Sequence, residues 1–126
     1  MPNFAMYCIF SKESLARMGG NRGKMVAQAG HAYLHAFLDA LSRFSESTDQ
    51  YMSGSTTKIG LLVETDEQLE SIFELQGGCG KTKVVDIGKT VFKGVPTLTC
   101  IGIGPIDRDS VNNGPVDLIK SAKILI

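Results

Sequence analysis

This sequence lacks several features that would place a protein in a class at once. No apolar run among its 126 residues is long enough to span a membrane, and the N-terminal FAMYCIF has neither a basic lead nor a small-residue cleavage site. We therefore expect no membrane segment and no signal peptide. The cysteines Cys8, Cys79 and Cys100 are odd in number and far apart, which favours reduced thiols in a cytoplasmic compartment over a disulfide framework. No cysteines and histidines have metal-ligand spacing, so we expect no metal.

The chain also lacks a net charge, because 13 lysines and arginines balance 13 aspartates and glutamates. The distribution of charge is more informative. Residues 11–24 and residues 81–93 each carry four basic side chains and one acid, whereas residues 64–74 carry five acids and no base. Either basic segment alone is typical of a solvated face. Both contain glycine-bearing loops, however, and two such loops that converge in space would form an anion site.

Local patterns predict the elements of one domain that covers residues 1–126. Apolar runs predict strands at residues 4–10, 58–63, 82–87 and 97–104. Helical spacing predicts helices from about Lys24 to Phe44 and from the capping box at Thr65 to Gly77. The polar segment 42–57 and the segment 105–115 are interpreted as connections, and residues 118–126 as an edge strand or short helix.

The order of these elements predicts an α/β fold with a mixed β-sheet. Strands alternate with helices in the first two thirds of the chain, which favours a largely parallel core of about four strands with helices packed on its faces. The last two predicted strands follow each other too closely for a crossover, so that pair should be antiparallel. The loops MGGNRGK and DIGKT follow the first and third strands. Ligands bind at the edge where parallel strands end, so we expect the two basic loops to meet there.

The first predicted helix carries an unusual polar stripe. One broad apolar face contains Met25, Val26, Ala29, Ala32, Tyr33, Ala36, Phe37, Ala40 and Leu41. Lys24, Gln28, His31 and His35 lie in a narrow stripe opposite, and the remaining flank is small or apolar, so the helix should be nearly surrounded. We interpret His35 as structural and leave His31 open between structure and site. Lys24 would stand beside free N–H groups at the helix start, which suits an oxyanion or phosphate.

The segment GGCGKT resembles the end of a phosphate-binding P-loop but lacks the rest of that pattern. The position that requires a glycine, five residues before Gly80, is Leu75. The segment also leaves a helix and enters a strand, which is the reverse of the P-loop context. We therefore interpret it as a helix stop followed by a turn.

Four segments resemble, in order and over nearly the whole chain, the type 2 peptidyl-tRNA hydrolase family. They are MGGNRGKMVAQAGHA, TKIGLLVETDEQL, VDIGKT and TLTCIGIGP. The resemblance implies a compact mixed α/β fold and hydrolysis of the ester that joins a peptide to the 3′ end of tRNA. It also implies a tRNA partner, no metal or other cofactor, and, as in many members, a homodimer.

The resemblance assigns roles to individual residues. Asp86 would orient or deprotonate a water, Lys24 would stabilise the oxyanion or hold the terminal ribose-phosphate, and Thr90 would donate a hydrogen bond. From the residues alone, Asp86 is equally typical of an Asp-x-Gly turn. The expected substrate-binding residues are Arg22, Gly23, Gln28, His31, Lys58, Gly88, Lys89 and Thr99. Lys81 and Lys93 would help to track the tRNA backbone by charge.

The chain departs from the family pattern around these residues. The first loop is two residues longer, and Leu62, Val85, Ile87 and Val91 replace a lysine, a glutamine, an alanine and a glutamine. Two other functions stay open: a catalytically weak relative that serves as a protein-binding adaptor, and a small phosphate- or nucleotide-binding module. Retention of Lys24, Asp86 and Thr90 favours the hydrolase over the adaptor.

Overall fold

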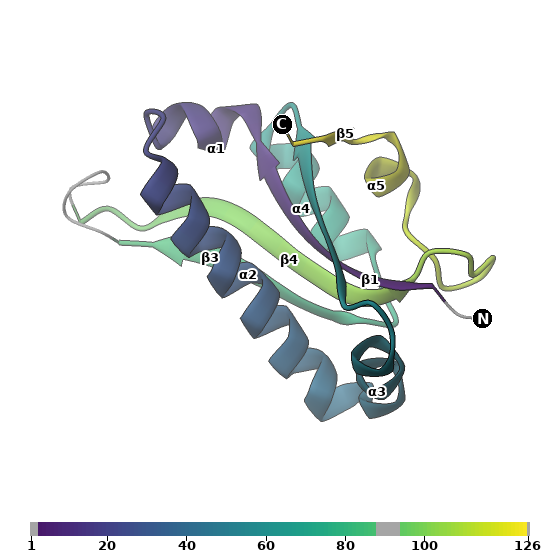
Figure 1. Ribbon diagram of the computed structural model, residues 1–126. Helices are drawn as coiled ribbons and strands as arrows, with labels where there is room; N and C mark the ends of the chain where they lie inside the picture. Colours follow the sequence, from purple (N-terminus) through teal and green to yellow (C-terminus); the bar gives the residue numbers. More distant parts are fainter. Residues whose placement is uncertain (1–2, 88–93, 126) are drawn as a thin grey trace.

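The computed structural model describes residues 3–87 and 94–125 of the chain. Its strands are β1 (Phe4–Ser11), β2 (Thr57–Val63), β3 (Gly80–Asp86), β4 (Thr97–Asp107) and β5 (Lys123–Ile124). Its helices are α1 (Lys12–Arg17), α2 (Arg22–Arg43), α3 (Ser45–Ser53), α4 (Asp66–Leu75) and α5 (Asp117–Ser121). Figure 1 shows α2 running diagonally across the sheet.

The strands form one five-stranded sheet in the order β3-β4-β1-β2-β5. Only β1 and β2 are parallel, whereas β4 is antiparallel to both β1 and β3, and β5 is antiparallel to β2. The mixed α/β class and the antiparallel β3–β4 pair are therefore confirmed, but the largely parallel core is wrong, because β4 lies between β1 and β3. Since both neighbours are antiparallel to β4, β1 and β3 still point the same way. Their carboxyl ends lie at one edge, as the site prediction requires.

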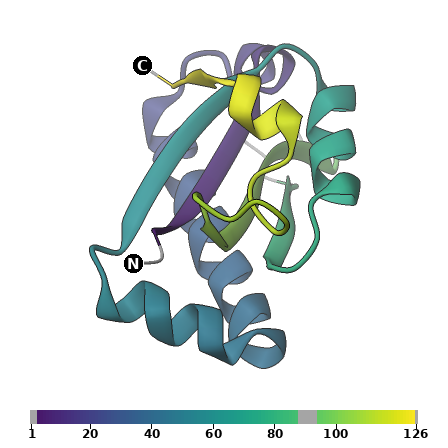
Figure 2. The same cartoon turned by 90° about the vertical axis from the view of Figure 1, so that its right-hand side faces the viewer.

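Helices cover both faces of the sheet (Figures 1 and 2). Alternate residues of β1 are buried on opposite faces of the sheet. Ala5, Tyr7 and Ile9 belong to the hydrophobic cluster that includes residues of α4. Cys8 and Phe10 belong to the cluster that includes Ala32 of α2. A strand whose two faces are both buried reads as a continuous apolar run. This explains why FAMYCIF was recognisable as a strand.

Small residues bring α2 very close to the sheet. The buried residues of this helix recur every fourth position, at Gln28, Ala32, Ala36 and Ala40. A Cβ at Gly102 would lie 2.1 Å from the Ala32 carbonyl oxygen, and one at Gly80 would lie 2.1 Å from the Ala36 carbonyl oxygen. Only glycine fits a backbone approach this close.

The predicted apolar face of α2 was partly wrong. Val26 and Leu41, which we placed on the core face, are 73% and 48% exposed. The helix is therefore not surrounded. Its buried line is centred on the alanines, because their small side chains permit the close approach, and the larger apolar side chains lie outside this line.

Two helices were missed, one between the first predicted strand and the glycine-rich loop and one in the segment 42–57, which we interpreted as a connection. Ser11 and Ser14 form a capping box that starts α1 directly after β1. Within the polar segment 42–57, α3 buries only Thr48 and Tyr51, and the Tyr51 hydroxyl donates to the Thr56 carbonyl oxygen at 2.9 Å. A helix with so few apolar positions has little periodic signal. At the end of the chain α5 and β5 are both present, and β4 extends through Pro105 into the segment predicted as loop.

The three cysteines are free and buried. Burial raises the pKa of the Cys79 thiol to about 11, and a hydrogen bond with Cys100 together with burial raises the pKa of Cys8. A thiol that stays protonated near neutral pH is a poor nucleophile. Cys8 and Cys79 therefore serve as core residues. Within residues 3–87 and 94–125, no helix has the length and hydropathy that crossing a membrane requires.

Candidate active site

The glycine-rich loop ends at an asparagine that caps α2. Gly19 and Gly20 have φ angles of 61° and 77°, in the left-handed region that glycine adopts without strain. Asn21 then accepts a hydrogen bond from the Lys24 backbone N–H at 2.9 Å. The helix therefore starts at Arg22, earlier than predicted, and the Lys24 N–H is not free. An asparagine before the first helical turn is an N-cap signal that could have located this start.

The Lys24 side chain reaches across to the end of β3. Its Nζ lies 2.6 Å from Asp86 Oδ2, and the two side chains are only 17% and 15% exposed. Gln28 Nε2, one turn along α2, donates to the same carboxylate oxygen at 3.2 Å. The end of β3 thus meets the start of α2, as predicted from the strand directions. A carboxylate with two such donors is held in one orientation.

Thr99 lies behind this cluster on β4. Its side chain is fully buried, and its Oγ1 donates to the Val84 carbonyl oxygen at 3.0 Å, with Gln28 Oε1 at 3.4 Å. A hydroxyl has one proton, so the shorter contact to Val84 is the stronger. Thr99 therefore ties β4 to β3 from within the core, directly behind Gln28.

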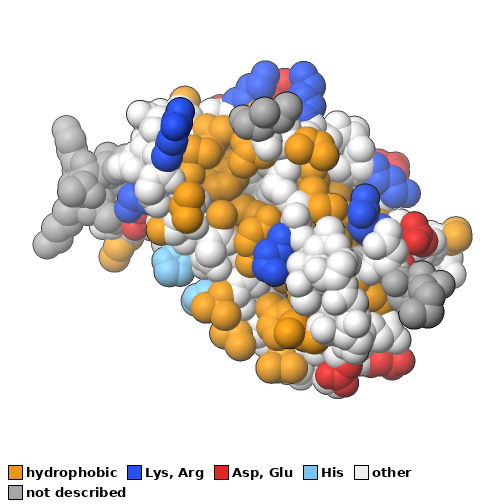
Figure 3. Space-filling model, in the orientation of Figure 1, with side chains coloured by type: hydrophobic (Ala, Val, Ile, Leu, Met, Phe, Trp, Pro, Cys, Tyr) orange, Lys and Arg blue, Asp and Glu red, His pale blue; other side chains and the backbone are white. Residues whose placement is uncertain are grey.

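A cavity of about 290 Å³ extends from Asp86 along β3. One wall is formed by residues 82–86 and the other by Gln28, His31 and His35. The two imidazole rings are exposed and meet edge to face, with centroids 5.9 Å apart. Figure 3 shows the histidine side chains together at the margin of the molecule. His35, which we interpreted as structural, thus lines the same cavity as His31.

Two predicted tRNA-contacting lysines lie elsewhere. Lys58 is on β2, where its ammonium donates to the Thr56 carbonyl oxygen at 3.2 Å and stands 5.7 Å from the Tyr51 ring centroid. It faces an apolar cavity on the other flank of α2. The Lys81 ammonium donates to the Phe73 and Gln76 carbonyl oxygens at the end of α4, at 2.5 and 3.1 Å. Lys81 therefore caps a helix, and its predicted phosphate contact stays a prediction that these hydrogen bonds disfavour.

The other predicted positions divide into two groups. Arg22 and Gly23 are exposed in the first turn of α2, next to Lys24. The predictions for Gly88, Lys89, Thr90, Val91 and Lys93 lie outside the described residues. The P-loop interpretation is excluded by the structure, because the GKT of GGCGKT, residues 80–82, lies within β3. In the described part of the chain, no three His, Cys, Asp or Glu side chains are grouped to hold a metal ion.

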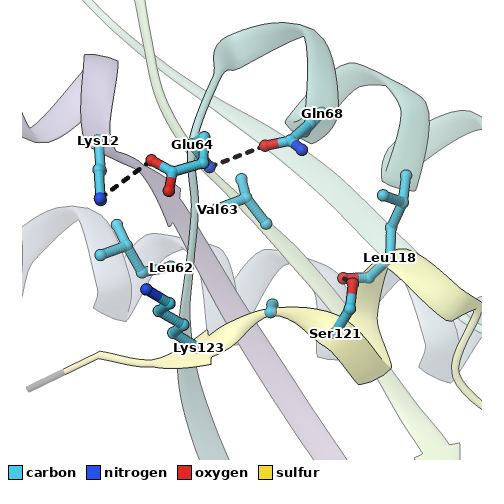
Figure 4. A pocket seen from close by; sticks show the side chains of 9 residues that line it. Lys12, Leu62, Val63, Glu64, Gln68, Leu118, Ser121 and Lys123 are labelled. Carbon is cyan, nitrogen blue, oxygen red and sulfur yellow. Dashed lines mark hydrogen bonds and ion pairs between the residues drawn. The ribbon is translucent and has the colours of Figure 1, made fainter.

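A second small pocket lies at the other end of the strand order from β3, among α1, β2, α4 and the C-terminal segment (Figure 4). Lys12 pairs with Glu64 at 3.1 Å, and Gln68 Oε1 accepts from the Glu64 backbone N–H at 2.8 Å. Leu62, which stands where the family pattern has a lysine, lines its wall. Its volume is about 100 Å³. Lys24 and Asp86 are not among its lining residues.

Comparison with known proteins identifies the family. The model of the family described as peptidyl-tRNA hydrolase PTH2 matches residues 6–118, which include Lys24 and Asp86. The chain belongs to this peptidyl-tRNA hydrolase family. A peptidyl-tRNA hydrolase of Methanocaldococcus jannaschii is 33% identical over 97 residues, 75% of this chain and 84% of the relative. One of Sulfolobus acidocaldarius is 33% identical over 104 residues, with 77% and 86% covered. One of Methanopyrus kandleri is 32% identical over 100 residues, with 78% and 84% covered.

Membership in the peptidyl-tRNA hydrolase family confirms the resemblance inferred from the sequence motifs. Sequence reasoning found Lys24, Gln28 and Asp86, which meet in the structure. It missed Asp39, whose Oδ2 accepts from the Lys81 backbone N–H at 3.0 Å beyond the histidines. Asp39 follows His35 at i+4 on the same side of α2, so extending the polar stripe by one turn would have included it.

Proposed function

We propose that this protein hydrolyses the ester bond between a peptide and the 3′ end of tRNA, at a site centred on Lys24 and Asp86. The observation that carries this proposal is the 2.6 Å contact between the two side chains. It joins residues from two motif segments 62 positions apart, both within the region that matches the family model. The adaptor and the nucleotide-binding module need no such arrangement.

The chemistry requires an aligned water and a donor for the developing oxyanion. The water oxygen forms a bond to the ester carbonyl carbon, and the bond from that carbon to the ribose 3′ oxygen breaks. Asp86 holds the water, accepts one of its protons and returns this proton to the leaving 3′ oxygen. The second water proton is released to solvent when the new carboxylic acid ionises. Lys24 stabilises the negative charge on the carbonyl oxygen. The products are a peptide with a free carboxylate and a tRNA with a free 3′ hydroxyl.

Other side chains support this reaction in the proposal. Gln28 fixes the Asp86 carboxylate, with Thr99 behind it. His31 lines the adjoining cavity, and Arg22 and Gly23 lie where the terminal phosphates would approach α2. The roles of Thr90 as a hydrogen-bond donor and of Gly88 and Lys89 as substrate contacts stay predictions from the family motif. Lys58 would contact tRNA only at a distance from the ester, since it lies across α2 from the cluster.

The test is release of labelled N-acetylamino acid from tRNA by the purified protein. We expect hydrolysis by the wild type and a loss of about 100-fold or more in kcat for Asp86→Asn. Glu64→Gln is the matched control, because it removes a carboxylate from an ion pair next to β2, which lies two strands away from β4 and apart from the Lys24–Asp86 pair. Absence of hydrolysis by the folded wild type would refute the function. Near-normal turnover of Asp86→Asn would remove Asp86 from the mechanism.

We further propose that residues 1–126 act as one peptidyl-tRNA hydrolase type 2-like domain in the cytoplasm. The family match covers residues 6–118, and the free thiols suit a reducing compartment. Limited proteolysis tests the domain: a single protected fragment is expected. Two independently stable fragments would contradict it.

We also propose that two copies form a homodimer through the outer side of α2 and neighbouring α3. Large apolar side chains are exposed there, which is unusual for a monomer surface: Val26, Leu34, Leu38, Leu41 and Met52. Light scattering should give the mass of a dimer for the wild type and of a monomer for Leu38→Glu. A monomeric wild type at micromolar concentration would contradict this assembly.

A further inference from the structure

The outer edge of β3 is available for pairing. This strand is at the end of the sheet order, so no described strand lies beyond it. The Lys81 backbone N–H points outward, since it donates to Asp39 of α2 at 3.0 Å. In an antiparallel ladder, alternate residues direct both N–H and C=O away from the partner strand. The ladder is irregular between Val84 and Val85, but the extra residue, Thr99, lies on β4, because Val84 pairs with Cys100 and Val85 with Leu98. The alternation along β3 therefore continues, and the main-chain groups of Lys83 and Val85 point outward as well.

The cavity beside the catalytic pair runs along this same edge. Residues 82–86 form one of its walls and α2 forms the other, with Asp86 among its lining residues. Residues 83–86 span about 10 Å at the rise of an extended strand. Asp39 occupies the next outward position, at Lys81, and so limits the open edge to this length.

A hydrolase that acts on peptides of many sequences must recognise what those peptides share. They share their main chain, and an exposed sheet edge binds an extended peptide through main-chain hydrogen bonds. Any such peptide would carry its ester at its C-terminal end. Lys24 and Asp86 lie at the C-terminal end of β3, so only a peptide that runs parallel to β3 places its ester beside them.

Building on the proposed function, we propose that the peptide part of the substrate binds as an extended strand along the outer edge of β3, parallel to it, with its C-terminal residue opposite Asp86. In this register the last residue donates its N–H to the Val85 carbonyl oxygen. The third residue from the end accepts from the Val85 N–H and donates to the Lys83 carbonyl oxygen. The N–H of the second residue from the end points away from β3, toward solvent or α2.

In the proposed register the N–H groups of the last peptide residues point alternately toward β3 and away from it, and this difference can be tested on the substrate. Three tRNAs are compared, carrying N-acetyl-trialanine, the same peptide N-methylated at the third residue from the end, and the same peptide N-methylated at the second. We expect methylation of the third residue to lower kcat/KM about 5- to 10-fold, the effect of losing one hydrogen bond and placing a methyl group against the strand. Methylation of the second residue, the matched control, should change kcat/KM less than 2-fold.

A variant tests the same bonds from the side of the protein. Val85→Pro removes an N–H that points away from β4, and an edge strand tolerates proline at such a position. Val85→Ala keeps the N–H and measures the loss of the side chain. We expect Val85→Pro to lower kcat/KM for the trialanine substrate about 5-fold relative to Val85→Ala, with both variants folded by circular dichroism.

The outcomes separate this inference from the proposed function. No hydrolysis of unmodified N-acetyl-trialanyl-tRNA would overturn the function itself. Hydrolysis at equal rates for all three substrates would leave the function standing and overturn the strand pairing. Equal rates are the result expected if the tRNA 3′ end, and not the peptide, occupies the cavity. Equal losses from methylation at both positions would overturn the parallel register. A selective loss at the third residue supports it.

Discussion

Removing the Lys24 ammonium should damage both catalysis and stability, for separable reasons. Loss of one partner from a fully buried ion pair costs about 3–5 kcal/mol, because the other charge is left buried. Here the two side chains keep 17% and 15% exposure, and Gln28 still donates to Asp86. We therefore expect Lys24→Ala to lower the free energy of unfolding by about 2 kcal/mol. For a chain of 126 residues this lowers Tm by roughly 6–10 °C.

The catalytic loss should be larger than this instability explains. An oxyanion donor is worth about 100- to 1,000-fold in kcat, and Lys24→Ala should lose that much at a temperature where the variant is fully folded. Lys24→Arg should restore stability more than kcat, because a broad guanidinium replaces a compact ammonium.

The double variant Lys24→Ala/Asp86→Asn separates the two effects. With both charges removed, no unpaired ion remains at the site, so Tm should rise above that of Lys24→Ala. Turnover should stay lost, because neither catalytic group is present. Calorimetry and single-turnover hydrolysis of N-acetylaminoacyl-tRNA measure the two quantities. If Lys24→Ala keeps wild-type kcat, or if the double variant regains turnover together with stability, the pair is only a structural link and the proposed site is wrong.

Three further predictions concern the close approach of α2 to the sheet, the Asp66 carboxylate and the Lys81 ammonium. Gly102→Ala should lower the free energy of unfolding by about 1–3 kcal/mol in urea titration, because its Cβ would lie 2.1 Å from a carbonyl oxygen of α2; an unchanged midpoint would refute the close approach. Burial alone would raise the pKa of Asp66, but hydrogen bonds from Arg17 and Ser11 outweigh it and lower that pKa. Its stabilising contribution is therefore complete above the ordinary carboxyl pKa of about 3.9 and is lost as pH falls through the lower folded value; Arg17→Gln should weaken this acid dependence, and identical profiles would contradict it. Lys81→Met should lower Tm but leave the salt slope of tRNA binding unchanged, since its ammonium caps α4; a slope reduced by about one would restore Lys81 as a phosphate contact.

The elements that the sequence predicted are those with strong local signals. The Thr65 capping box and the apolar residues after it locate α4, because both are encoded within one helix. The pairing of β4 with β1 was not predicted. A buried strand has the same apolar pattern whether its neighbour is parallel or antiparallel, so the pattern does not identify the neighbour. The glycines of β3 and β4 explain the position of α2, but their partner alanines lie 40 or more residues away in the sequence, the nearest being Ala40 for Gly80. Such contacts become visible only in three dimensions.

The site was predictable to the extent that it depends on strand direction. Lys24 lies beyond the end of β1 and Asp86 is the last residue of β3. These two strands point the same way although β4 lies between them. The charge pattern was less informative, because a basic segment does not reveal what each ammonium contacts. Lys81 and Lys83 come from the same basic segment as the site, but Lys81 caps α4 and Lys83 pairs with Glu70 at 2.5 Å.

The departures from the family pattern next to Asp86 are surface positions in the structure. Val85 and Ile87 are 54% and 60% exposed, so their apolar side chains do not pack into the core. Replacing both by the family's residues, Val85→Gln and Ile87→Ala, should therefore leave Tm within about 2 °C of the wild type, the usual range for surface substitutions. Any change in hydrolysis would then report on substrate contact and appear in KM, since the Lys24–Asp86 pair is untouched. A fall in Tm of 6 °C or more, on the scale expected for Lys24→Ala, would show that the Val85 and Ile87 side chains stabilise the fold. The two positions would then differ from the family pattern because of packing and not because of substrate contact.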